Sequence, residues 1–311
     1  MSGSTVTAAG PLWAITSYFN PQRYRCRRAN FRVFRERLSL PLVAVELSFD
    51  GRFELGPNDA EVLIQRRGHD VLWQKERLLN VALEALPTSC EQVVWVDCDV
   101  VFQRDDWMAE VSRQLRDVPL LQPFSRVHHL PPELTPEEFG AGVAQSDQLS
   151  AAAIVAQGRL PESGSRAPGL AWAARRELLE VHGFYDACIV GGGDSAMVGA
   201  AYGVFEQVIS VQAMNDRQQN DYLAWAKPFH RAVRGEVACV AGDLLHLWHG
   251  ESRHRHYYGR YRALTPFDFD PSTDIAQSKS GCWRWNSDKP ALHQFLHDYF
   301  ANRAEDGQRA A

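Results

Sequence analysis

Apolar runs and helically spaced apolar positions alternate along most of the chain. Short apolar runs of the kind that form buried strands occupy 12–18, 40–49, 93–102 and 118–124. Apolar residues spaced three to four apart predict helices between them, over 23–38, 70–86 and 105–115. Strands that alternate with helices predict the α/β class: a mostly parallel sheet with helices on both faces. In such a sheet, ligand-binding loops lie at the carboxyl ends of the strands.

The helix predicted over 70–86 has the clearest boundaries. Asp70 is a candidate N-cap, Leu79, Ala82 and Leu86 form an apolar row, and Pro87 follows. The second half of the chain continues with a strand and helix over 169–186, a glycine-rich turn into a helix over 189–203, and a strand and basic aromatic segment over 236–261. Residues 289–306 predict a closing helix.

Residues 126–168 differ from the segments around them. They are rich in Pro, Gly and Ser, with a short Ala-rich stretch between. Because a strand and helix resume directly afterwards, we interpret them as a flap over an active site and not as an interdomain linker. We expect one domain over 1–265 and a helical extension, 266–311, that packs on it.

Composition excludes several classes of protein. The 311 residues are 45% hydrophobic with a net charge of −5, so the core is ample and no basic surface favours nucleic acid. Six scattered cysteines without a Cys-x-x-Cys pair indicate neither a zinc ribbon nor a disulfide scaffold. The first residues carry no signal-peptide pattern and no apolar stretch long enough to span a membrane, so we expect a cytoplasmic protein.

Two acids interrupt the apolar run "VVWVDCDVVF" at 93–102. In an extended strand Asp97 and Asp99 would point the same way, near the carboxyl end of a strand. Paired carboxylates there fit a Mg²⁺ or Mn²⁺ ion that carries a diphosphate. The alternative is that one acid caps a turn and the other is solvated.

Further candidate ligands lie far along the chain. His246 and His249 in "HLWH" are three apart, so both rings could reach one ion, and with Asp99 they would form a site that suits Mn²⁺ better than Mg²⁺. The alternative is one packed and one exposed histidine. Two local arginine clusters fit a phosphate-bearing small molecule as well as a solvated face: Arg23, Arg25, Arg27 and Arg28, and Arg253 and Arg255.

"VGGGDSAM" places Asp194 after three glycines at the start of a predicted helix. Gly192 and Gly193 would let the backbone approach a ligand closely, and Asp194 could be a general base aimed at an acceptor hydroxyl. The alternative is an ordinary N-cap after a flexible turn. Lys75 and Arg77, on the helix before the acid pair, would by themselves be interpreted as a solvated helical face.

Taken together, these segments resemble the GT-A glycosyltransferases, especially the β-1,4-galactosyltransferase type and its bacterial relatives. The likeness spans roughly 12–265, and four stretches carry it in order: "TSYFNP", "WQKERLLNVALEAL", "VVWVDCDVVF" and "PGLAWAARRELLEVHGFYDACIVGGGDSAM". "HLWHG" falls where that family has a Met-x-x-His metal pair. The resemblance implies a metal-dependent, inverting transfer from a nucleotide-diphosphate sugar, with a UDP-linked donor expected, to the hydroxyl of a glycan or other acceptor.

The resemblance also implies roles for single residues. Asp99 and His249 would bind the metal, with His246 in the place of the family's methionine. Asp194 would be the catalytic base. The donor would contact Thr16, Tyr18, Asn20 and Arg23 of the first strand and its loop, and Gly192 and Gly193 of the glycine turn. Lys75 of the basic helix would lie near the phosphates, and Asp97 of the acid pair near the ribose or a metal-bound water.

The chain departs from the family near its glycines. The family's tryptophan before them is missing, with 187–190 in that region, and Gly193 stands where an acid usually precedes the catalytic aspartate. We therefore do not infer from the resemblance that the transferred sugar is galactose or N-acetylglucosamine. The family's secretory anchor is also absent, which suits a bacterial or phage enzyme.

Three other functions remain open. A haloacid-dehalogenase-type phosphatase would use Asp97 as nucleophile, although that motif normally follows the first strand. A sugar nucleotidyltransferase should have a glycine-rich loop after its first strand, and "TSYFNPQRYR" has no glycine. A non-catalytic protein that binds nucleotide sugars would share the site without turnover.

Overall fold

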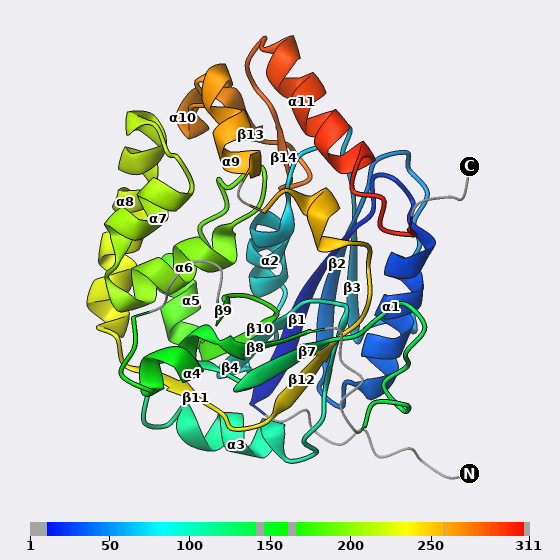
Figure 1. Ribbon diagram of the computed structural model, residues 1–311, viewed down its shortest axis with the longest axis vertical. Helices are drawn as coiled ribbons and strands as arrows, with labels where there is room; N and C mark the ends of the chain where they lie inside the picture. Colours follow the sequence, from blue (N-terminus) through cyan, green and yellow to red (C-terminus); the bar gives the residue numbers. More distant parts are fainter. Residues whose placement is uncertain (1–10, 141–145, 161–165, 258, 308–311) are drawn as a thin grey trace.

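A seven-stranded sheet forms the centre of the protein (Figure 1). The computed structural model describes residues 11–140, 146–160, 166–257 and 259–307. The sheet order is β11-β6-β10-β4-β1-β2-β3, and neighbouring strands are parallel except where β10 pairs with β4 and β6. The strands are β1 (Leu12–Phe19), β2 (Leu42–Ser48), β3 (Val62–Arg67), β4 (Gln92–Val96), β6 (Leu120–Gln122), β10 (Ala171–Arg175) and β11 (Val237–Cys239). The predicted α/β class is confirmed.

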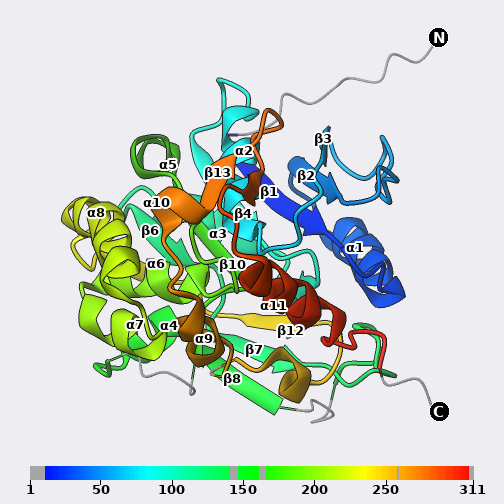
Figure 2. The same ribbon diagram turned by 90° about the horizontal axis from the view of Figure 1, so that it is seen from above.

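Both faces of this sheet are buried, which explains its almost continuously apolar strands. In β1, Trp13 and Ile15 enter one hydrophobic core, and Ala14 and Tyr18 enter the other. Figure 2 shows α1 and α8 at opposite sides of the molecule. The helices of the first core include α2 (Lys75–Glu84), α5 (Arg176–His182), α6 (Gly193–Tyr202), α8 (Asp216–Val233) and α11 (Pro290–Ala301), and those of the second core are α1 (Arg25–Arg37) and α3 (Trp107–Gln114).

A second, five-stranded sheet corrects the interpretation of 126–168 as a flap. Its order is β5-β12-β7-β8-β9. Its strands are β5 (Val100–Phe102), β7 (Arg126–His129), β8 (Ser146–Ser150), β9 (Arg166–Ala167) and β12 (Asp243–His246), and α4 (Ala151–Ala156) follows β8. The Pro-, Gly- and Ser-rich composition of 126–168 did not indicate these short elements, although Val127 in β7 and Ile154 in α4 are buried. The other parts of the predicted flap, 141–145 and 161–165, lie outside the described residues.

The single strand predicted over 93–102 is wrong. The chain leaves the central sheet at Val96, turns through Asp97–Asp99, and enters the second sheet as β5. The turn forms because the amide of Asp97 donates to the Leu170 carbonyl at 2.7 Å and the carbonyl of Asp99 accepts from the Leu247 amide at 2.8 Å. The two acids therefore lie on a junction between two sheets and not along one face of a strand.

Other element boundaries also differ from the prediction. Helix α2 begins at Lys75, with Gln74 before it, and Asp70 accepts from the Trp285 amide at 2.9 Å and does not cap the helix. Strand β3 and helices α7 (Phe205–Val211) and α8 are additions to the predicted elements. Asn215 caps α8 by accepting from the Gln218 amide, a sequence pattern that predicts a helix start.

The C-terminal stretch packs into the first core. Its elements are η1 (Ser252–Arg255), α9 (Gly259–Leu264), η2 (Thr265–Phe267), α10 (Pro271–Asp274), β13 (Ile275–Gln277), β14 (Trp283–Trp285) and α11. The strands β13 and β14 pair, so 266–311 is not purely helical. Tyr261 and Phe300, on either side of the expected boundary at 265, share one core. Over the described ranges, no helix combines the length and the apolar character needed to cross a bilayer.

Candidate active site

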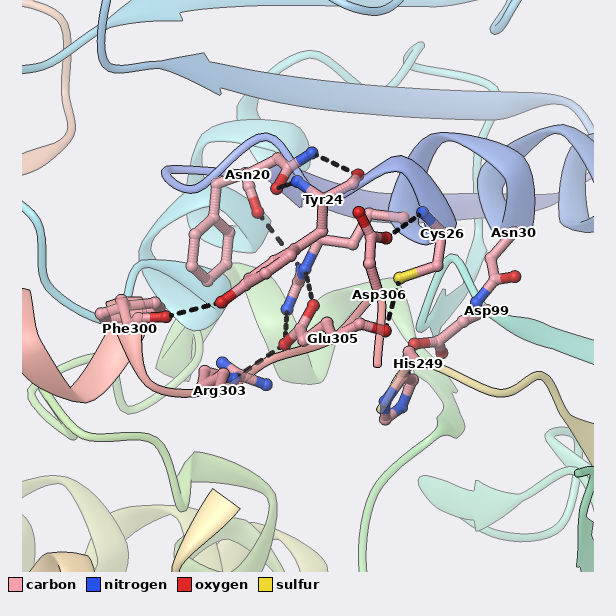
Figure 3. Close-up of polar contacts among 12 residues, drawn as sticks. Asn20, Tyr24, Cys26, Asn30, Asp99, His249, Phe300, Arg303, Glu305 and Asp306 are labelled. Atoms are coloured by element: carbon pink, nitrogen blue, oxygen red, sulfur yellow. Dashed lines mark hydrogen bonds and ion pairs between the residues drawn. The ribbon is translucent and has the colours of Figure 1, made fainter. Parts of the chain in front are cut away.

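Asp99, His246 and His249 meet at the junction between the two sheets. One Asp99 oxygen lies 3.7 Å from Nε2 of His246 and the other lies 3.4 Å from Nε2 of His249. The two Nε2 atoms are 2.7 Å apart, and the candidate ligand atoms of all three residues lie within 4.8 Å of one another. The side chains that the sequence placed 147 to 150 positions apart thus point at one position, which Figure 3 shows for Asp99 and His249.

Strand pairing produces this convergence. β5 and β12 are antiparallel, with Val100 opposite His246, so the residue before β5 and the residue that ends β12 are neighbours. His249 follows three residues later in the loop after β12, and Gly250, with φ +94°, turns the chain away.

The electrostatics of Asp99 fit a cation. Burial opposes its ionisation, but His246 and the guanidinium groups of Arg255 and Arg27 outweigh burial and lower the pKa of Asp99. Its Oδ1 is buried and has no hydrogen-bond partner among the described residues. A carboxylate and two imidazoles, with one carboxylate oxygen unused, match the ligand types of a divalent metal ion.

His129 is a neighbour of the cluster that the sequence analysis missed. Its Nδ1 lies 2.8 Å from Nδ1 of His246, on the ring edge that faces away from Asp99. Burial and the neighbouring His246 lower the pKa of His129 to about 4, so it is neutral at pH 7. This contact between the two Nδ1 atoms holds the His246 ring with Nε2 toward the cluster. The pairing of β7 with β12, which places His129 beside His246, was the missing information.

Lys75 joins the two other acids. Its Nζ lies 2.6 Å from an Asp97 oxygen and 2.8 Å from an Asp194 oxygen, and the residue is only 7% exposed. Burial opposes the charge, but Asp194 and Asp97 outweigh it and raise the pKa of Lys75. Burial and the charges of Asp194 and Asp99 raise the pKa of Asp97 to about 6, against the effect of Lys75. A solvated face for Lys75 and Arg77 is thus wrong, since Arg77 is also buried and pairs with Asp186 at 3.0 Å.

Glu76 lies beside this network and was also missed. It is 5% exposed, and one carboxyl oxygen accepts from Trp73 Nε1 at 3.0 Å. The other oxygen, Oε1, is buried without a partner among the described residues. Burial and the charge of Asp194 raise the pKa of Glu76 to about 8, so it is a neutral acid at pH 7. No periodicity signals such a residue, because Glu is common in the first turn of helices.

Packing accounts for two of the three consecutive glycines. A Cβ on Gly193 would lie 2.3 Å from Glu76 Oε1, and one on Gly192 would lie 2.4 Å from the Tyr261 hydroxyl. Gly192 also has φ +110°, which disfavours other residues. Protein side chains therefore occupy the space beside these glycines, where the sequence analysis expected a ligand. Asp194 is the second residue of α6, with its side chain 25% exposed.

A cavity of about 270 Å³ lies at the carboxyl ends of β1 and β2. Tyr18, Asn20 and Arg23, three of the predicted nucleotide contacts, line it together with Glu46 and Glu54. The Tyr18 hydroxyl donates to a Glu54 oxygen at 2.5 Å, and Asn20 donates to the same carboxylate at 3.2 Å.

Thr16 does not line this cavity. It is fully buried, and its hydroxyl donates to the Val96 carbonyl at 2.7 Å. The hydroxyl thus joins β1 to the end of β4 and has no exposed surface beside the cavity, and the nucleotide contact of Thr16 stays a prediction.

Comparison with known proteins gives matches only among solved structures. No family model and no curated protein matches the chain. Glucosyl-3-phosphoglycerate synthase from Mycobacterium tuberculosis, solved with Mn²⁺, UDP and phosphoglyceric acid, is 13% identical over 76% of this chain and 70% of its own, with a TM-score of 0.40. A mannosyltransferase from Pyrobaculum calidifontis, solved with GDP-Man and Mn²⁺, is 17% identical over 96% of this chain and 74% of its own, with a TM-score of 0.39.

A third similar structure is the catalytic domain of Drosophila β1,4-galactosyltransferase 7, solved with xylobiose. It is 11% identical over 92% of this chain and 98% of its own, with a TM-score of 0.37. Glycosyltransferases are thus among the solved structures that this chain resembles, at low identity. The function proposed below rests on the side chains of the site.

Proposed function

We propose that the protein is a metal-dependent glycosyltransferase of the GT-A type. It would transfer a sugar, with inversion, from a UDP-linked donor to a hydroxyl of a glycan or other acceptor. The observation that carries this proposal is the convergence of Asp99, His246 and His249 beside the Asp97–Lys75–Asp194 network. Asp97 is two residues before Asp99, and Lys75 joins Asp97 to Asp194. The candidate cation site at Asp99 and the candidate base Asp194 are therefore connected through one network.

The donor set supports a cation site. Asp99, His246 and His249 would hold Mn²⁺ or Mg²⁺, and the mixture of imidazole and carboxylate favours Mn²⁺. When bound, such an ion balances the negative charge of a diphosphate leaving group. The arrangement of His129 behind His246 supports this role, because ring orientation by an outer neighbour is typical of metal-ligating histidines.

Asp194 is the proposed base. Its position in the first turn of α6 and its two contacts with Lys75 Nζ, at 2.8 and 3.1 Å, fix the carboxylate in place. The acceptor hydroxyl would lose its proton to Asp194 as its oxygen bonds to the anomeric carbon, while the bond from that carbon to the diphosphate oxygen breaks on the opposite face. Lys75 would orient Asp194, and its second contact, with Asp97, would connect Asp194 to the part of the site that binds the donor.

The 270 Å³ cavity is the proposed donor subsite. Tyr18, Asn20 and Arg23 offer one phenol, one amide and one guanidinium group beside the carboxylate of Glu54. Aromatic and polar groups of this kind suit a base and a ribose. The backbone of Gly192 and Gly193 stays a proposed contact of the donor sugar, although packing already explains these glycines.

The phosphatase alternative lacks support at its second acid. Asp97 follows the fourth strand of the chain, and its carboxylate forms an ion pair with Lys75 at 2.6 Å. A phosphatase of this type would also need a second acidic motif later in the chain, for which "AGDLLH" at 241–246 offers Asp243. Asp243 lies at the start of β12, at the opposite end of the strand from His246, and pairs with His128 at 3.2 Å. A phosphatase site would need both acids around one phosphate.

A thermal-shift screen tests the proposed function. UDP, GDP and CMP sugars are each added with and without Mn²⁺, and the ligand that stabilises the protein is then incubated with hydroxyl-bearing acceptors and followed by mass spectrometry. We expect metal-dependent stabilisation by UDP sugars and a product heavier by one sugar residue. Hydrolysis of simple phosphate esters without any response to nucleotide sugars would assign the phosphatase instead.

A further inference from the structure

Three arginines, the buried Arg255 and Arg303 and the half-buried Arg27, surround one carboxylate near the C-terminus. Glu305 is fully buried, and its oxygens lie 2.9 Å from Arg27 Nη2, 2.8 Å from Arg303 Nε and 3.5 Å from Arg255 Nη2. Figure 3 shows Glu305 with Arg303 on one side and Asp99 and His249 on the other. Burial opposes ionisation of Glu305, but these arginines lower its pKa to about 2, so it is negative at pH 7.

A fourth arginine joins this group without an acid of its own. Arg260 is 9% exposed, and no carboxylate of the described residues pairs with it. It donates to the hydroxyls of Tyr299, at 3.1 Å, and Tyr261, at 3.0 Å. The Tyr299 hydroxyl in turn lies 3.4 Å from the Arg255 carbonyl, so Arg260 and Arg255 flank the same tyrosine.

The four guanidinium groups exceed the nearby negative charge. With Glu305 ionised, the surplus is three, and counting Asp99 as well leaves two. Four of their nitrogens, Arg255 Nε, Arg260 Nε, Arg303 Nε and Arg303 Nη1, are buried with no hydrogen-bond partner among the described residues, although Arg303 Nε forms an ion pair with Glu305 at 2.8 Å. Buried charges are normally paired, and an unpaired one costs several kcal/mol. A surplus of buried donors and charge therefore indicates that an anion belongs here.

The arginines extend between the two halves of the candidate active site. Arg255 donates to Nδ1 and to the carbonyl of His249. A Cβ on Gly191 would lie 3.2 Å from Arg260 Nη1, so that guanidinium lies against the turn that leads to Asp194. The cluster thus spans from the proposed cation site to the glycine turn.

We propose that Arg255, Arg260 and Arg303 form a binding site for a phosphate or diphosphate anion, next to the proposed cation site. Guanidinium groups bind phosphate oxygens through paired N–H donors, which suits the unused nitrogens. Glu305, in the C-terminal segment 302–307, pairs with Arg303 on this site and with Arg27 of helix α1 on its other side. In identifying the anion with a substrate group, the proposal rests on the proposed function. The group is then either the diphosphate of the donor or a phosphate on the acceptor.

Calorimetric titration of the full chain with inorganic pyrophosphate, without metal, tests the site. We expect measurable binding, at least tenfold weaker in Arg260→Gln and in Arg303→Gln, and unchanged within twofold in Arg113→Gln, which alters an exposed pair on α3. Arg260→Lys keeps the charge without the paired donors and should fall between the wild type and Arg260→Gln. UDP that binds more tightly than a sugar phosphate would assign the donor diphosphate, and the reverse order would assign the acceptor.

Two results would overturn the anion site: no binding of pyrophosphate by the wild type, or equal binding by wild type, Arg260→Gln and Arg303→Gln. The outcome is separable from the proposed function. If pyrophosphate binding needs these arginines but the protein transfers no sugar, the anion-site proposal is supported and the proposed transferase function is contradicted. Sugar transfer in which Arg260→Gln changes neither the donor KM nor the acceptor KM would support the transferase and contradict the anion site.

Discussion

The ammonium nitrogen of Lys75 lies 2.8 Å from a carboxylate oxygen of Asp194, although the two residues are 119 positions apart in the chain. The same nitrogen lies 2.6 Å from Asp97. Lys75 therefore connects the acid-bearing turn after β4 with the first turn of α6. If Asp194 is the base of a transfer reaction, its position depends on a lysine that comes from neither element.

Lys75→Met removes the only cation that contacts both acids among the described residues. We expect the free energy of unfolding at pH 7 to fall by about 3 kcal/mol, because two mostly buried carboxylates lose their partner. Urea denaturation measures this loss, and Arg113→Met, in an exposed pair, should cost less than about 1 kcal/mol. Adding Asp194→Asn to Lys75→Met should recover at least about 1 kcal/mol relative to additivity. Strictly additive effects would show that the contact does not stabilise the fold.

Asp194→Asn tests the role of the base. We expect kcat for sugar transfer to fall by about 10²- to 10⁴-fold, with the dissociation constant of the donor changed less than threefold, because only proton transfer is lost. Steady-state kinetics and calorimetry give the two numbers. Asp216→Asn, an exposed acid in the first turn of α8, is the matched control and should leave kcat unchanged. An equal loss of donor binding in Asp194→Asn would assign this residue a structural role.

Gly193→Ala separates packing from ligand approach. The added Cβ would lie 2.3 Å from Glu76 Oε1, so Glu76 and its Trp73 partner must move. We expect a loss of about 1–3 kcal/mol in the free energy of unfolding, the range for overpacked sites. Gly140→Ala, where nothing lies within 4 Å of the new Cβ, should change it by less than about 0.5 kcal/mol. If both variants are equally stable, the glycine is retained for a ligand and not for Glu76.

Glu76 should make stability depend on pH. Its pKa is raised from 4.5 to about 8 in the folded state, so the folded protein holds a proton that the unfolded chain has released. Stability from this group is fully present below pH 4.5 and is lost as pH rises toward 8, by at most about 1.4 kcal/mol per pH unit.

The matching measurement compares Glu76→Gln with Glu84→Gln, an exposed site on the same helix. Denaturation at pH 5, 7 and 9 should show Glu76→Gln gaining on the wild type as pH rises, because glutamine cannot ionise. Parallel pH curves for Glu76→Gln and the wild type would contradict a neutral Glu76.

The sequence predicts those features that short-range patterns determine. The alternation of strands and helices, the N-terminal pair of β1 and α1, and the helix that begins beside Asp194 follow from periodicity and glycine placement. The meeting of Asp99 with His246 and His249 was foreseen from the chemistry of the residues and from the resemblance. That they bind a metal stays a prediction.

Features that depend on pairing between distant segments were missed. His129 becomes a neighbour of His246 only because β7 pairs with β12. The strand expected over 93–102 is divided because its first part pairs within the central sheet and its last part pairs with β12. The burial of Lys75 also follows from Asp97 and Asp194, which neutralise it from elements far along the chain. Nothing in the local pattern of α2 distinguishes this lysine from one on a solvated face.

The most direct test of the central claim is the anomalous diffraction of crystals grown with Mn²⁺ and UDP. We predict one manganese peak bonded to Asp99, His246 Nε2 and His249 Nε2, with diphosphate oxygens completing its coordination. A peak bound by other residues, or no peak at these three side chains when UDP is visible, would contradict a metal-dependent transferase built on this junction.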